Sequence, residues 1–379
     1  MAVKNKERED YIRAKFALGA LFLLFGYVVY RAVLGAFGWH DGWFMIVATL
    51  LAVFFVAISL IGLSYRHSAV RRGYWLVSYW SGWIGVFFGA AILLDMLEHL
   101  ALWTDVTVAP DAIGFTALGV AAIVIIYGTW QSTRVQVSHA TIALPSLPEH
   151  WQDKTVVFAS DLHLGNVHDE HFARRVASRI NALAPEAVFI GGDLYDGVAS
   201  SLARDLIAPF RELHAPHGVY YVSGNHEYFQ NHTEDFWNAI RDAGMMILDT
   251  RAIDLRGITL AGVDYQDAKE RDGFDAALAG MAILKDRPSI LLKHVPEHLD
   301  IAEKHGVSLV ISGHTHNGQI WPLNYCGYLF KEFYYGHHHL NGTQIYVSSG
   351  AGTQGAPFRL GTRSEIVAIT LVKKPDASR

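Results

Sequence analysis

Five short clusters of oxygen and imidazole donors occur between residues 161 and 316, and each follows an apolar run. We expect each cluster where a strand gives way to a loop, because loops at strand ends carry the chemistry of α/β proteins. The clusters are Asp161-Leu-His163, Gly191-Gly-Asp193, Gly224-Asn225-His226-Glu227, Lys293-His294 and Gly313-His314-Thr315-His316. Part of this set forms a candidate ligand group for two adjacent divalent metal ions. Its members are Asp161, His163, Asp193, Asn225, His294, His314 and His316.

The residue types in these clusters favour hard or borderline divalent cations, because they offer carboxylate, carboxamide and imidazole ligands. One residue separates Asp161 from His163, so both side chains face the same way at a strand end. Asp193 follows two glycines, which allow a tight turn. Its carboxylate stands between the other donor clusters, and we expect it to bridge the two ions. Each motif alone is common by chance, whereas their order and their shared setting after strands make the set informative.

Composition divides the chain into two domains. Hydrophobic residues make up 51% of the 379 residues and charged residues only 18%, and nearly all the long apolar runs precede residue 131. We expect a transmembrane domain at residues 1–134 and a catalytic domain at residues 135–379. The net charge of −5 gives no reason to expect a nucleic-acid partner. The single cysteine, Cys326, excludes an internal disulfide and a thiolate metal site.

Four segments of the first domain are long and apolar enough to be predicted as membrane spans, which take roughly 20 helical residues each. They are residues 16–37, 43–65, 74–94 and 113–130. Tryptophan and tyrosine residues cluster near their ends, as interfacial anchors do. Buried helices of a soluble protein are the alternative, but four such runs in succession favour a bilayer as the partner.

The distribution of positive charge predicts the orientation of these spans. Five basic residues precede the first span, and Arg66, Arg71 and Arg72 lie between the second and the third. The segment between the third and the fourth has acidic residues and no basic ones. We therefore expect a multi-pass protein of the cell inner membrane with a cytoplasmic N-terminus. An even number of spans would also put the catalytic domain in the cytoplasm, and a miscounted span would reverse that.

Beyond residue 134, strand-like runs alternate with helical ones, which predicts a mixed α/β core with helices outside the sheets. Strands are expected at residues 134–144, 155–160, 187–191, 219–222, 246–249, 258–263, 290–294, 308–312, 344–348 and 365–371. Helices are expected at residues 169–183, 200–213, 233–243 and 297–305.

The order of the five clusters resembles the calcineurin-like metallophosphoesterase superfamily, over roughly residues 135–372. The tail at residues 346–352, followed by Pro357-Phe-Arg359, is similar to a bacterial membrane-associated branch of that superfamily. The resemblance implies a four-layer αββα sandwich with two facing sheets. It also implies a centre of two divalent metal ions, commonly manganese, iron or zinc.

The resemblance assigns a role to each candidate ligand. One metal would be held by Asp161, His163 and His316, the other by Asn225, His294 and His314, with Asp193 as the bridge. His226 matches a histidine that is no ligand and lies beside the leaving group. If protonated, it would donate to the leaving oxygen. Glu227 either orients that histidine or is a solvent-exposed glutamate.

These expectations describe a membrane-anchored phosphoesterase that hydrolyses a phosphodiester or pyrophosphate bond with a hydroxide bridging the two metals. Anchoring brings the site to the headgroup plane of the lipid bilayer, so a lipid-linked phosphoester is one candidate substrate. An anchored phosphatase or nucleotide phosphodiesterase for soluble substrates is the alternative. A non-catalytic membrane scaffold or sensor is a third reading, which the complete ligand set argues against. The sequence does not indicate the oligomeric state.

Three further features have two readings each. Arg359 is a candidate substrate-binding residue that would contact phosphate, or it forms a structural salt bridge. Residues 337–339 are three histidines, which we expect in a solvated loop rather than in a third metal site. The aromatic residues at 330 and 333–335 either form an apolar lip beside the site or pack in the interior.

Overall fold

The computed structural model describes residues 2–37, 43–61, 68–104, 109–196, 200–228 and 234–375. Its internal contacts divide the chain into two compact units. The helical unit comprises Met1–Thr133 together with Gly355–Leu360, which we call the docked segment. The α/β unit comprises Arg134–Gln354 and Gly361–Arg379. Nothing in the sequence pattern indicates that the docked segment would group with the helices.

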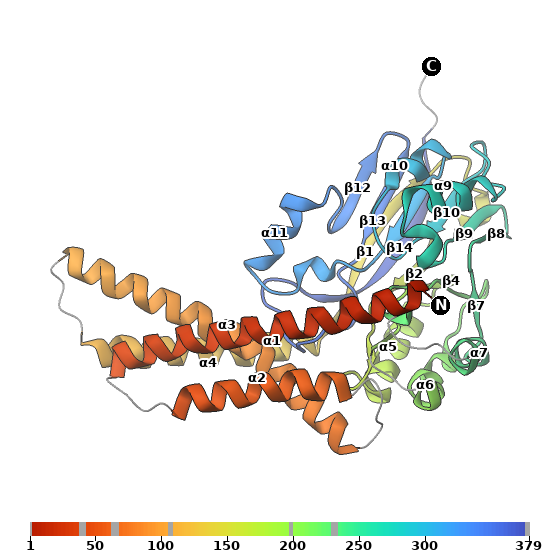
Figure 1. Ribbon diagram of the computed structural model, residues 1–379. Coiled ribbons are helices and arrows are strands. Elements are labelled where there is room, and N and C mark those ends of the chain that lie inside the picture. The colour runs from red at the N-terminus through yellow and green to blue at the C-terminus, as the bar shows by residue number, and fades with distance from the viewer. Residues whose placement is uncertain are drawn as a thin grey trace. The chain divides into compact units, whose positions relative to one another are not determined.

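The helical unit contains α1 (Ala2–Phe37), α2 (Trp43–Ile61), α3 (Ser68–Thr104) and α4 (Pro110–Ser132) (Figure 1). Among the described residues, three stretches are long and apolar enough to cross a membrane, at Ile12–Val33, Ala69–Leu97 and Asp111–Ser132. The prediction of four such spans was therefore wrong. The apolar part of α2 is the shorter stretch Met45–Ile61, which extends about 25 Å against the roughly 30 Å of a hydrocarbon core. Residues 62–65 of the predicted second span lie outside the described residues.

The docked segment packs on the middle of α3, at Gly82, and on the end of α4 within the helical unit. Phe358 is 1% exposed, and its ring lies so close to Gly128 that a Cβ there would overlap it. The Ser132 hydroxyl donates to the Pro357 carbonyl over 2.8 Å, and the Arg359 backbone N–H donates to the Gly128 carbonyl over 2.9 Å. Close packing of Phe358 on the backbone of Gly128 and two hydrogen bonds thus hold this segment.

The α/β unit is built on two six-stranded mixed sheets. The first runs in the spatial order β1 (Val135–Leu144), β14 (Ser364–Lys373), β2 (Lys154–Ala159), β4 (Ala187–Ile190), β6 (Val219–Tyr221), β7 (Met245–Ile247). The second runs in the order β12 (Gly336–Leu340), β13 (Thr343–Val347), β11 (Leu309–Ser312), β10 (Ser289–Leu292), β9 (Ile258–Gly262), β8 (Arg251–Leu255). A two-stranded sheet pairs β3 (Leu164–Gly165) with β5 (Tyr195–Asp196).

Three hydrophobic clusters separate four layers in this unit. The central cluster joins the facing sheets, since it contains Phe158 of β2 together with Leu260 of β9 and Ile290 of β10. A second cluster lies between the first sheet and α5 (Glu170–Ala182), α6 (Ser200–Ile207) and α7 (Glu234–Asp242). The third covers the second sheet with α8 (Tyr265–Ala268), α9 (Arg271–Ala279) and α10 (Leu299–Lys304). Figure 1 shows α5–α7 and α9–α10 on opposite sides of the sheets, in the order αββα.

All ten predicted strands are present within a few residues of their expected bounds, and two strands of the large sheets were not predicted. One is β8, which pairs only with β9 at the edge of its sheet. The other is β12, which contains His337–His339, so the prediction of a loop there was wrong. These histidines alternate between exposed and half-buried, because β12 is also an edge strand with one face in solvent.

Candidate metal centre

The predicted ligands all lie in loops that leave the carboxyl ends of parallel strands. Asp161 and His163 follow β2, Asp193 follows β4 and Asn225 follows β6; these three strands are mutually parallel in the first sheet. In the second sheet, one loop after β10 and one after the parallel β11 carry the remaining histidines. Carboxyl ends of neighbouring parallel strands share one sheet edge, so five separate loops deliver their side chains to one place.

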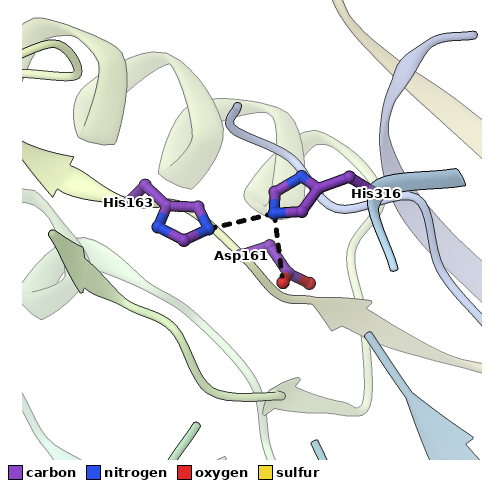
Figure 2. A group of neighbouring side chains, drawn as sticks. All are labelled: Asp161, His163 and His316. Carbon is purple, nitrogen blue, oxygen red and sulfur yellow. Dashed lines mark hydrogen bonds and ion pairs between the residues drawn. The ribbon is translucent and has the colours of Figure 1, made fainter. Parts of the chain in front are cut away.

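The first group of donors is Asp161, His163 and His316 (Figure 2). His163 Nε2 lies 3.0 Å from His316 Nε2, and the same His316 atom lies 3.5 Å from Asp161 Oδ1. All three side chains are buried, with Asp161 at 0% exposure. In Figure 2 the His316 nitrogen stands between the other two donors, as ligands of a common ion do.

The second group is formed by Asp193, Asn225, His294 and His314. His294 Nε2 lies 3.1 Å from Asp193 Oδ2 and 3.2 Å from Asn225 Oδ1. The rings of His294 and His314 are 5.2 Å apart between centroids. Asp193, His294 and His314 place one donor atom each within 4.8 Å of one another.

Asp193 stands between the two groups. Its Oδ2 lies 3.1 Å from His294 Nε2 of the second group and 3.9 Å from His163 Nε2 of the first. Its Oδ1 accepts the backbone N–H of His226 over 2.8 Å, which fixes the carboxylate plane. One carboxylate that reaches both groups is what a bridging ligand requires.

The donor set fits divalent cations. The Nδ1–H of His294 donates to the Gly191 carbonyl over 2.8 Å, which leaves Nε2 with a lone pair when the ring is neutral. That lone pair faces two further acceptor atoms, on Asp193 and Asn225, at 3.1 and 3.2 Å. Such a convergence of acceptor atoms in a buried site is stabilised by positive charge between them, which the proton on Nε2 supplies without metal and a bound cation would supply in its place. In the first group, Nδ1 of His163 is also buried without a hydrogen-bond partner among the described residues.

Five of the seven predicted ligands adopt a left-handed backbone conformation, which non-glycine residues rarely do. The φ angles are +54° for Asp161, +49° for His163, +48° for Asp193, +72° for His314 and +50° for His316. Each such residue costs free energy, of order 1–3 kcal/mol, which the surrounding structure must offset. Backbone strain concentrated on the proposed ligands is typical of a site whose geometry serves chemistry.

Burial and mutual charge set the protonation of the donors. Burial lowers the pKa of His163 to about 4 and that of His314 to about 3, so both rings are neutral and able to bind a metal. Burial acts in the same direction on His294, but the Asp193 carboxylate outweighs it and raises the pKa of His294 to about 9. In return, the charges of His294 and His226 overcome the burial of Asp193 and hold its pKa well below the usual range.

His226 lies against the first group without joining it. Its ring contacts His163 with centroids 4.6 Å apart, and its Nδ1 lies 3.2 Å from Asp196 Oδ1. Burial alone would lower the pKa of His226, but the carboxylates of Asp193 and Asp196 raise it to about 9. The ring is therefore an imidazolium near neutral pH. Asp196, in the short strand β5, was not predicted, although its place three residues after Asp193 was a usable signal.

Glu227 is completely buried, so the reading of a solvent-exposed side chain was wrong. Its carboxylate accepts the backbone N–H groups of Asp193 over 2.9 Å, Leu194 over 2.7 Å and Gly224 over 2.7 Å. Its charge also acts on His226, in the direction that raises the pKa of that ring. It joins the loop after β4 to the loop after β6, and so fixes the spacing of Asp193 and Asn225.

The remaining candidates lie elsewhere. Arg359 belongs to the docked segment of the helical unit and has 0% exposure, so its contact with phosphate stays a prediction. Among the aromatic residues, Phe333 and Tyr334 are buried and belong to the packing. Phe330 ends α11 (Leu323–Phe330) and is 85% exposed. The Tyr334 carbonyl accepts the Thr315 hydroxyl over 2.7 Å, which steadies the loop between His314 and His316.

Comparisons with known proteins agree with this geometry. A family model described as calcineurin-like phosphoesterase matches residues 154–318. A metallophosphoesterase of Aquifex aeolicus is 34% identical over 65% of this chain and 96% of its own length. A metallophosphoesterase of Helicobacter pylori is 34% identical over 59% of this chain and 60% of the relative. A transmembrane protein with a metallophosphoesterase domain from Danio rerio is 32% identical over 67% of this chain and 62% of the relative.

The chain belongs to the calcineurin-like metallophosphoesterase family. Membership implies a metal-dependent phosphoester hydrolase domain, which is the class that the loop-borne ligand set predicts. The match covers 60% of the Helicobacter relative and 62% of the Danio relative, so those proteins extend well beyond it.

Proposed function

We propose that this protein is a membrane-anchored phosphoesterase with two divalent metal ions, which hydrolyses a phosphodiester or pyrophosphate bond. The observation that carries the proposal is the position of Asp193, whose Oδ2 lies 3.1 Å from His294 of one donor group and 3.9 Å from His163 of the other. The buried donors around it include no thiolate, and their carboxylate, carboxamide and imidazole atoms are ligands that a pair of divalent cations would hold together.

Each side chain has a role in this proposal. The first metal would be held by Asp161, His163 and His316, the second by Asn225, His294 and His314, and both by Asp193. When bound, the cations supply Lewis acidity that makes water nucleophilic near neutral pH and neutralises phosphate charge. The donor types suit manganese, iron or zinc.

His226 would act on the leaving group. Water oxygen bonds to phosphorus, the bond from phosphorus to the leaving oxygen breaks, and that oxygen takes a proton from the imidazolium of His226. A proton released by the water restores the imidazolium, so atoms and charge balance over the turnover. Asp196, 3.2 Å from Nδ1, holds the ring so that Nε2 is the nitrogen that donates.

Replacement of Asp193 and of His226 separates metal binding from proton donation. In Asp193→Ala we expect loss of both metal content and hydrolysis, because both donor groups lose a ligand. In His226→Ala we expect full metal content with a rate about 10²- to 10⁴-fold lower on esters with poor leaving groups. Metal analysis and steady-state assays of the full-length protein in detergent measure both. Hydrolysis by Asp193→Ala at the wild-type rate would refute the assignment.

The substrate class follows from the anchoring. The three apolar helices bring the site to a bilayer, which supports a lipid-linked phosphoester as the substrate. Full-length protein in mixed micelles, offered lipid-linked and water-soluble diesters at equal concentration, tests this by the ratio of kcat/KM values. Preference for the lipid supports the proposal, and equal rates indicate an anchored enzyme for soluble substrates. A protein that binds metal but hydrolyses neither would be a scaffold or sensor.

We further propose that the protein lies in the cell inner membrane with its catalytic domain in the cytoplasm. The support is the basic residues up to Lys15 in the first part of α1 and Arg71 and Arg72 near the start of α3, set against the acidic residues at the end of α3 and after it. This orientation requires α2 to cross as well, although its apolar stretch is short. Reporter fusions after α2 and after residue 375 test it, since an extracytoplasmic signal from the second fusion would reverse the assignment.

A further inference from the structure

Gln354 contacts His226 on the side away from Asp196. The side-chain amide nitrogen of Gln354 lies 3.0 Å from His226 Nε2, whereas Asp196 takes Nδ1 at 3.2 Å. In the described part of the chain this is the one hydrogen bond of the Gln354 side chain, which is exposed. The nitrogen it touches is the one from which a proton would pass to the leaving group. The amide therefore occupies the space where a leaving oxygen must come.

The backbone of Gln354 is fixed although its side chain is open to solvent. The Gln354 N–H donates to Gln319 Oε1 over 3.0 Å, and Gln319 Nε2 donates to the Gln354 carbonyl over 3.3 Å. Gln319 is 8% exposed, and its own carbonyl accepts the Thr362 hydroxyl over 2.6 Å. Gln319 also directly follows the turn His316–Gly318, which begins with a proposed ligand. This pair of amide hydrogen bonds ties the Gln354 loop to the metal-binding loop.

A carboxamide suits this place chemically. It carries a donor and an acceptor on one rotatable group. Its NH2 lies at Nε2 here, where it can donate only to the neutral ring, and a half-turn of the amide brings its oxygen to accept from Nε2–H of the imidazolium and leaves the NH2 to donate to an oxygen of the substrate. An apolar side chain there would leave His226 Nε2 without a partner, and a lysine or arginine would repel the imidazolium. Because the backbone is clamped, only the side-chain torsions need to change when a substrate enters.

We propose that Gln354 is a leaving-group positioning residue: it holds the His226 ring before substrate binds and then hydrogen-bonds the oxygen-bearing leaving group beside Nε2. Gln319 supports it by fixing its backbone. The inference rests on the proposed hydrolysis and deepens it, since it places the leaving group between His226 and Gln354. It predicts a substrate whose departing part offers a hydrogen-bonding oxygen at that point.

The test uses full-length protein in detergent and a series of methyl phosphodiesters whose leaving groups run from p-nitrophenol to an aliphatic alcohol. Gln354→Met keeps the side-chain length and removes both hydrogen-bonding groups. We expect its loss in kcat to grow with the leaving-group pKa and to reach about 10-fold for the aliphatic ester, a part of the general-acid contribution. Its KM for the nitrophenyl ester should change less than its kcat for the aliphatic one.

A double-mutant cycle tests whether Gln354 acts through His226. In the His226→Ala background, Gln354→Met should add almost no further loss, because the partner it positions is gone. Independent, additive losses would overturn the proposal, as would an equal loss for all leaving groups. A melting temperature of Gln354→Met well below that of the wild type would also overturn it, since the residue would then be structural. If the wild type hydrolyses none of the esters, the proposed function itself has failed.

Discussion

At the scale of single residues, the proposed ligands are held in place although their backbone conformations are unfavourable. Five proposed ligands have positive φ angles, and the two aspartates among them are fully or almost fully buried. A buried carboxylate without a compensating charge is costly, which is why Asp193 keeps its charge only beside His294 and His226. Strain and buried charge thus coincide at Asp161 and Asp193.

Replacement of His163 by two small residues measures the strain directly. His163→Gly and His163→Ala both remove the ligand, but only alanine must hold a Cβ at φ +49°. In chelator-treated protein, His163→Gly should therefore be more stable than His163→Ala by about 1 kcal/mol. Chemical denaturation measures the difference. Ser178, exposed within α5, is the control, because there alanine should be the more stable of the two.

Metal uptake should depend on pH through His294. The Asp193 carboxylate overcomes the effect of burial and raises the pKa of His294 to about 9, so the ring is protonated in the metal-free protein at neutral pH. Metal must displace that proton, and the apparent affinity should fall by up to about 10-fold for each pH unit below 9. Calorimetric titration in two buffers of different ionisation enthalpy counts the protons released. Affinity that does not vary between pH 6 and pH 9 would contradict this account.

At the scale of elements, the ligand loops are packed backbone against backbone. A Cβ added at Gly192, where φ is +89°, would lie 2.6 Å from the Gly224 nitrogen and 2.8 Å from His294 Nδ1. The Glu227 carboxylate joins the same two loops through their N–H groups. Any change in their spacing therefore moves Asp193 relative to Asn225.

Gly192→Ala should disrupt this packing, and Gly244→Ala provides the matched control. Both glycines have positive φ, at +89° and +80°, but nothing lies within 4 Å of a Cβ at Gly244. Gly244→Ala should cost about 1 kcal/mol of stability from its backbone conformation alone. Gly192→Ala should cost clearly more, roughly 2–4 kcal/mol, and should also lower metal content. Denaturation and metal analysis compare them, and equal effects would show that the loop contact is unimportant.

At the scale of the whole molecule, the chain leaves the α/β unit at Gln354 and returns at Gly361, and the docked segment between them belongs to the helical unit. Its anchor is the Phe358 ring on Gly128. The residue before the segment contacts the proposed proton donor, His226. The docked segment is therefore joined in the chain directly to the residue that contacts His226.

Gly128→Ala should loosen the docked segment, with Gly119→Ala on the same helix as control. A Cβ at Gly128 would overlap the Phe358 ring, whereas nothing lies within 4 Å of one at Gly119. Because alanine is the better helix former by about 1 kcal/mol, Gly119→Ala should be neutral or stabilising. Gly128→Ala should lower the melting temperature and slow hydrolysis of poor leaving groups. Equal melting temperatures and equal rates of hydrolysis in the two variants would mean that the packing of Phe358 on Gly128 has no influence on the candidate metal centre.

Much of this protein is readable from its residues because the signals are local. Apolar runs in the first third, alternation of strands and helices after residue 134, and donor clusters at strand ends depend only on nearby positions. These patterns predicted the α/β class, the strands and the seven ligands that the fold brings together. They failed for edge strands such as β12, where one face is exposed, the other is only half-buried and the histidines on both give no hydrophobic alternation.

Contacts between residues far apart in the chain required the folded molecule. Three features have no local signature: the burial of Glu227 beneath four backbone N–H groups, the approach of Gln354 to His226 across 128 positions and the grouping of Phe358 with the helices. The physical reason is that hydrogen bonding and desolvation depend on which parts of the folded chain meet. The presence of a glutamate or glutamine in the sequence does not show whether its side chain is exposed or buried. Residue types alone therefore indicated which chemistry was available, while three-dimensional packing selected the partners that hold it in position.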